Sequence, residues 1–158
     1  MGERSFMPLN NLFRKIEALE RFNIEKEIVD IINKNGDYIT GLLRLQLQEG
    51  KDSNNENITI FGRDHYSDLT IFNKEMHGVG LGKQTEWITN YMSGRFYMSL
   101  KTTASGRVFK TESDVPYFKD IIARSGDVIM KLNKKHLEEF SSEILIPELR
   151  RRFKAMQK

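Results

Sequence analysis

The stretch Phe96-Tyr-Met-Ser-Leu-Lys-Thr-Thr-Ala-Ser-Gly-Arg-Val-Phe-Lys-Thr111 decides the fold class of this 158-residue chain. Two apolar runs, Phe96–Leu100 and Val108–Thr111, flank the small polar segment Ala104-Ser-Gly-Arg107. A glycine-bearing polar segment between two such runs is typical of a β-hairpin turn. We therefore expect antiparallel strands here. The β character begins at Thr85 and includes three large apolar residues, Trp87, Ile88 and Tyr91.

Both ends of the chain show the spacing of amphipathic helices. Apolar residues recur every three or four positions from Leu12 to Ile32, which predicts one long or broken helix over roughly residues 10–34. Asn133 can cap a C-terminal helix that contains Leu137, Phe140 and Ile144. Pro147 should kink or restart this helix because it lacks an N–H and clashes with the preceding turn.

The segments between these helices alternate short elements with polar turns. Leucines alternate with polar residues in Tyr38–Gln48, which favours a half-buried strand, and a second short strand is expected at 58–61. A polar loop over 50–57 separates them. A short helix at 66–76 ends at Gly78, and another follows Pro116.

These elements predict an α+β fold in which terminal helices pack with a small antiparallel β-sheet. Residues 1–9 are expected to form an N-terminal tail and residues 10–158 a single structural domain.

The chain has no cysteine, which excludes disulfides and thiolate metal sites. No apolar run is long enough for a signal peptide or a membrane span, so no membrane partner is expected.

No motif in the sequence predicts an enzyme. The run Gly78-x-Gly80-x-Gly82 lacks the spacing of a nucleotide-binding fingerprint and favours a hinge or an ordered loop. His65, His77 and His136 show no metal-ligand spacing, and solvated surface positions are expected for them. Because no nucleophile, base and orienting group occur together, we expect no catalytic residue, no cofactor and no metal site.

The basic C-terminus is the one charge cluster in the sequence. Arg150, Arg151 and Arg152 are followed by Lys154 and Lys158, although the whole chain has a net charge of only +3. Consecutive helical residues point about 100° apart, so the three arginines cannot all face one partner. A solvated end that complements the helix dipole is the favoured interpretation, and contact with acidic subunits or with DNA is the alternative.

Three stretches resemble small virion proteins of tailed phages that infect gut Bacteroides, crAss-like phages included. The first is Leu45-x-Leu-x-x-Gly-Lys-Asp-Ser53, and the second is Thr89-Asn-Tyr-Met-Ser-Gly-Arg-Phe-Tyr-Met-Ser-Leu100. The third combines Leu132-Asn133, Leu137-Glu-Glu-Phe140 and Ile146-Pro-Glu-Leu149 with the basic end. The resemblance extends from about residue 24 onward and departs from the family pattern at Ser93 and Arg95.

This resemblance implies a ring-forming head–tail connector, neck or tail subunit that folds in the host cytoplasm and ends in the virion. Its expected partners are identical subunits and adjoining portal, neck or tail components, with possible proximity to packaged DNA. Two alternatives stay open, a basic DNA- or RNA-binding accessory protein and an enzyme with an unrecognised site. The expected contact residues come from the C-terminus and two other positions: Arg150, Arg151, Arg152, Phe153, Lys154, Gly80 and Trp87.

Overall fold

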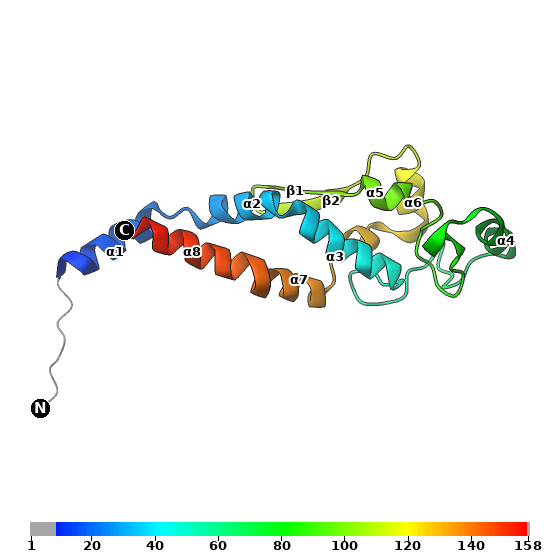
Figure 1. Cartoon of the computed structure of the whole chain (residues 1–158), viewed down its shortest axis with the longest axis horizontal. Helices are drawn as coiled ribbons and strands as arrows, with labels where there is room; N and C mark the ends of the chain where they lie inside the picture. Colours follow the sequence, from blue (N-terminus) through cyan, green and yellow to red (C-terminus); the bar gives the residue numbers. More distant parts are fainter. Residues whose placement is uncertain (1–8, 158) are drawn as a thin grey trace, which may run out of the picture.

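The computed structural model describes the backbone of residues 9–157 and the side chains of residues 13–157, and it is long and narrow (Figure 1). Of the predicted tail, only Leu9 is described, and it already belongs to the first helix. The helices are α1 (Leu9–Arg21), α2 (Ile24–Lys34), α3 (Gly36–Gln48), α4 (Asp68–His77), α5 (Arg95–Ser99), α6 (Phe118–Ser125), α7 (Lys134–Phe140) and α8 (Ile146–Met156), with 3₁₀ turns at Gly80–Lys83 and Asp127–Met130 and a π-helical turn at Ser141–Leu145.

The sheet is one antiparallel hairpin of β1 (Lys101–Ser105) and β2 (Val108–Glu112), so the predicted α+β fold is confirmed. Ser105 pairs with Val108, which leaves a two-residue loop whose first residue, Gly106, has φ +57°. Glycine adopts this left-handed backbone without a steric penalty, which is why the turn forms at this point. The hairpin packs along α2 and α3 (Figure 1).

Two of the strands expected from the sequence are wrong, because both segments are helical. In α3 the buried residues include Ile39, Leu43 and Leu47, which are spaced by four, whereas Leu45 is 51% exposed. The leucines at positions 43, 45 and 47 alternate as in a strand, but only the first and last of them are buried, as the spacing of a helix requires. In α5, Phe96 and Tyr97 are buried while Met98 is 77% exposed, which is also a helical arrangement.

The remaining expected strands are reduced to irregular chain. At 58–61 the described backbone forms only an isolated bridge between Ile60 and Arg63, and Trp87–Tyr91 forms no strand. These segments still contribute to the core, because Ile58 and Ile88 are buried. Their apolar residues indicated burial correctly, but they have no neighbouring strand with which to pair.

The terminal helices follow the sequence prediction in its broken form. Helices α1 and α2 are separate, and the side chain of Asn23 caps α2 by accepting a hydrogen bond from the backbone N–H of Lys26 at 3.0 Å. Asn133 caps α7 in the same way, at 3.0 Å from the backbone N–H of His136. The predicted restart at Pro147 is confirmed, since α8 begins at Ile146 and carries the proline in its first turn.

The core lies where α2 and α3 meet the hairpin and the segments that follow it, and it includes Ile31, Ile39, Leu43, Ile129 and Phe140. A buried amide fixes two of these parts together. Gln46 donates to the carbonyl of Lys131 at 2.9 Å and accepts from the N–H of Asn133 at 2.7 Å. Because both atoms of its amide are bonded, burying this polar group carries no unsatisfied donor or acceptor.

Candidate functional site

The predicted C-terminal contact residues differ in what they touch. Arg150 and Lys154 are exposed and form no ion pair within the described part of the chain. Arg151 is also exposed, but both of its hydrogen bonds go to Glu148, at 2.6 and 2.8 Å. Phe153 is half-buried and packs edge-on against Phe22, with ring centroids 5.3 Å apart.

Arg152 of α8 binds two carboxylates of α2, Glu27 and Asp30, and one carboxylate of its own helix, Glu148. Its guanidinium lies 2.6 Å from Glu27, 2.6 Å from Asp30 and 3.0 Å from Glu148, and only 16% of its side chain is exposed. Hydrogen bonds from Arg151 and Arg152 lower the pKa of Glu148 to about 2. Those from Lys34 and Arg152 lower the pKa of Asp30. Two of the three consecutive arginines are therefore neutralised within the molecule, which weakens the case for a DNA-binding C-terminus.

Gly80 and Trp87 do not join this cluster. Gly80 begins the 3₁₀ turn beside α4, at the end of the molecule remote from the C-terminus (Figure 1). Trp87 is 38% exposed and donates its indole N–H to the carbonyl of Gln48 at 2.9 Å. The loop around Gly80 approaches Met92 closely, because a Cβ on Gly82 would lie 2.0 Å from the carbonyl oxygen of Met92. The expected hinge or ordered loop stays a prediction.

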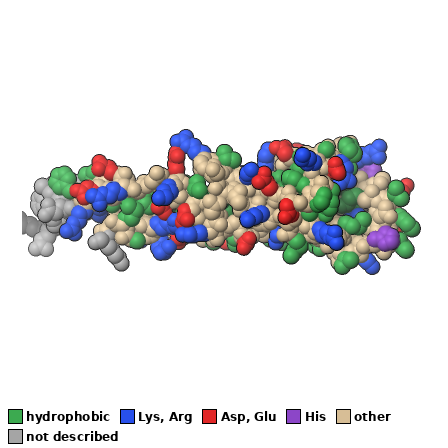
Figure 2. All heavy atoms as spheres, turned by 90° about the horizontal axis from the view of Figure 1, so that it is seen from above, with side chains coloured by type: hydrophobic (Ala, Val, Ile, Leu, Met, Phe, Trp, Pro, Cys, Tyr) green, Lys and Arg blue, Asp and Glu red, His purple; other side chains and the backbone are tan. Residues whose placement is uncertain are grey.

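Helix α4 leaves part of its apolar surface exposed, although Ile71 on its inner side packs against the core. It buries Lys74, which is 2% exposed, and presents an apolar face to solvent. The members of this α4 apolar face are large and exposed by 57–70%: Leu69, Phe72, Met76 and the adjoining Val79. Hydrophobic side chains are visible over this end of the molecule in Figure 2. Surface helices normally bury such a stripe, so this face is suited to contact with another protein.

A second unpartnered face lies on α1, at the opposite end of the molecule (Figure 1). Phe13, Ile16 and Leu19 are 58%, 42% and 61% exposed, and their spacing of three places them within one arc of the helix. Ala18 and Phe22 lie on the other side, where Ala18 is buried and Phe22 contacts Phe153. We refer to Phe13, Ile16 and Leu19 as the α1 apolar face.

The total accessible surface area of the chain is larger than that of a compact monomer of its mass. The chain exposes 11161 Å², whereas a compact 18.5 kDa monomer exposes about 8200 Å². The chain therefore leaves more surface exposed than a compact single subunit of its mass does.

Sequence reasoning found the apolar residues of α4 but not the direction in which they face. Leu69, Phe72 and Met76 have the spacing of a core stripe, and the helix itself is confirmed. The histidine prediction was wrong for His136, which is 4% exposed with its Nε2 unbonded, whereas His65 and His77 are exposed.

Within the described residues, no group of three or more acidic or histidine side chains is placed to hold a metal ion. None of the helices described combines the length and apolar character needed to span a bilayer. Comparison with protein-family models, with curated proteins and with solved structures found no match.

Proposed function

We propose that this chain is a non-enzymatic structural subunit of a tailed bacteriophage that assembles with copies of itself in the neck or tail. The observation that carries the mode of assembly is the pair of exposed apolar faces on α1 and α4. The phage assignment itself rests on the sequence resemblance in the segments 45–53, 89–100 and 132–149.

The two faces differ in composition and lie at opposite ends of a long molecule (Figure 1). Contact between the α1 apolar face of one copy and the α4 apolar face of the next is a heterologous contact. Repeated heterologous contacts close into a ring when the rotation between neighbours divides a full turn. Such contacts would also cover the side chains that a solitary subunit leaves in water, which supports assembly as the functional state.

The packing of α8 along α2 is compatible with a role in assembly. Arg152 fixes α8 to α2 through Glu27 and Asp30, and it also binds Glu148 of its own helix. The contact between Phe22 and Phe153 extends this junction to the end of α1. The α1 apolar face is thereby presented on a supported helix. A rigid presentation lowers the entropy lost when the face meets a neighbour.

The experiment that tests the function is quantitative mass spectrometry of purified particles, combined with imaging of the neck and tail. We expect several copies per particle, arranged as a closed ring. Absence of the protein from particles, or a single copy with no identical neighbour, would refute the proposal. Cross-linking between α1 of one copy and α4 of the next supplies the test of the contact itself.

A further inference from the structure

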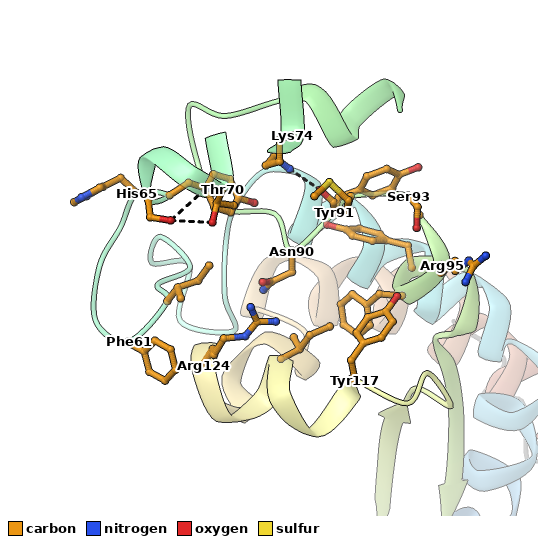
Figure 3. Close-up of a pocket in the computed structure, with 18 of the residues that line it drawn as sticks. Phe61, His65, Thr70, Lys74, Asn90, Tyr91, Ser93, Arg95, Tyr117 and Arg124 are labelled. Carbon is orange, nitrogen blue, oxygen red and sulfur yellow. Dashed lines mark hydrogen bonds between the residues drawn. The ribbon is translucent and has the colours of Figure 1, made fainter. Parts of the chain in front are cut away.

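A pocket of about 810 Å³ lies between α4, α6 and the segment that leads into α5 (Figure 3). Its volume falls within the range of small-molecule sites. It is on the side of α4 that carries Lys74, so it is separate from the α4 apolar face. Nothing in the proposed assembly function requires this cavity.

The charge of the pocket has one sign. Among the described residues that line it, none is acidic, and four are lysine or arginine: Arg63, Lys74, Arg95 and Arg124. Within residues 13–157, neither Arg63 nor Arg95 makes a side-chain hydrogen bond or ion pair. Arg124 uses only its Nε, which donates to the carbonyl of Asp120 at 3.1 Å. The guanidinium groups retain most of their donors for a ligand.

Lys74 is the strongest indication of an anionic ligand. Its side chain is buried, and its ammonium donates to the carbonyl of Tyr91 at 2.5 Å and lies 4.8 Å from the ring centroid of Tyr66. No carboxylate in the described chain pairs with it. A buried charge without a counter-ion is costly, and an ammonium with three N–H groups can still donate to an anion in the pocket.

The lining of the pocket includes tyrosine rings and the side-chain amide of Asn90. Tyr91 and Tyr117 line it, and Asn90 and Arg124 point toward one another in the space between α4 and α6 (Figure 3). Asn90 is held at φ +55°, and its amide nitrogen donates to Ser125 at 3.2 Å, which leaves its carbonyl oxygen free to accept. Aromatic faces stack with nucleobases, and an amide can bond their edges.

The rim carries a strained aromatic residue. Phe61 and Gly62 form the tight turn of Ile60–Arg63 and have φ +50° and +76°. A left-handed backbone is unfavourable for a bulky residue, yet Phe61 is 72% exposed and gains little from burial. The backbone N–H of Phe61 donates to the carbonyl of Arg124 at 2.8 Å, which fixes the turn against the pocket wall. Strain of this kind concentrates at ligand-binding positions.

We propose that this pocket binds a nucleotide, either free or at the 5′ end of a nucleic-acid strand, with Lys74, Arg63 and Arg124 holding its phosphate. The guanidinium groups match the geometry of phosphate oxygens, and the tyrosine rings offer the base a stacking surface. Inorganic phosphate would leave the aromatic walls unused, and a neutral nucleoside would leave the buried ammonium without a counter-ion.

Calorimetric titration of the whole chain with AMP, adenosine and inorganic phosphate tests this proposal. We expect AMP to bind at least about tenfold more tightly than either fragment, since one charged hydrogen bond contributes that much. A 5′-phosphorylated oligonucleotide distinguishes the two sources. Tighter binding than AMP assigns the site to a strand end, and equal, weaker or absent binding assigns it to the free nucleotide. The proposal is overturned if AMP and the oligonucleotide both fail to bind, or if AMP binds no more tightly than either fragment.

Variants locate the site. Lys74→Met keeps the length of the side chain and should weaken nucleotide binding at least about tenfold. Lys135→Met removes an exposed lysine of α7 that lies outside the lining of this pocket and is the matched control, so equal weakening by both variants counts against the pocket. If Lys74→Met does not fold, Arg63→Gln at the exposed rim decides, because unchanged binding in that variant refutes the assigned phosphate contacts. Failure of ring assembly would leave these titrations unaffected.

Discussion

Replacing the α4 apolar face with polar residues should abolish association between copies without unfolding the subunit. The triple variant Leu69→Gln, Phe72→Gln and Met76→Gln changes residues that are 70%, 57% and 62% exposed. Glutamine has a helix propensity close to those of leucine and methionine and better than that of phenylalanine. The helix therefore stays formed, and the change acts only on the surface that the helix presents.

The exposed fractions set the size of the effect. Burying a whole side chain of this type contributes about 1.5–3 kcal/mol, so the exposed parts of these residues contribute about 1–2 kcal/mol each when a partner covers them. The three together amount to roughly 3–6 kcal/mol, which corresponds to association weakened about a hundredfold or more. The free energy of unfolding of the isolated subunit should change by less than about 1 kcal/mol because surface substitutions rarely do more.

Sedimentation velocity over a concentration series measures the association, and chemical denaturation measures the unfolding. Leu45→Gln is the matched control, since Leu45 is 51% exposed on α3 and lies outside both apolar faces. It should leave both quantities unchanged. A wild-type chain that stays monomeric at every concentration, or a triple variant that associates as tightly as wild type, would refute the reasoning.

Three further predictions concern stability. Gly106→Val should lower the free energy of unfolding by about 1 kcal/mol or more, measured by urea denaturation, because valine is strained at φ +57° although the space around this glycine is open. Ile39→Ala removes a fully buried side chain and should lower it by about 2–5 kcal/mol in the same assay. Glu148 has a pKa lowered from 4.5 to about 2, so its ion pairs stabilise the fold above pH 4.5, and this contribution is lost as the pH falls toward 2. Thermal melts across this range should show a smaller acid destabilisation in Glu148→Gln than in wild type.

The sequence by itself determined the elements whose signals are local. Three of these signals are the glycine of the hairpin turn, the capping side chain of Asn133 and Pro147. Each acts within a few residues, and the structure confirms the elements that they begin or end. The α+β class follows from these elements. The chemistry of a cap or a turn depends on backbone groups close along the chain, which the sequence states directly.

Only the tertiary structure decided which apolar residues face the core and which face solvent. Alternation in Tyr38–Gln48 and the apolar run Phe96–Leu100 indicated strands, but burial follows the helical spacing of both segments. The first of them packs against other helices and the hairpin. The stripe of α4 has core spacing, yet it faces outward while Lys74 faces the pocket. Hydrophobic periodicity shows which residues share one face of an element. It does not show whether that face lies against the core or against solvent, because this depends on contacts between residues far apart in the chain.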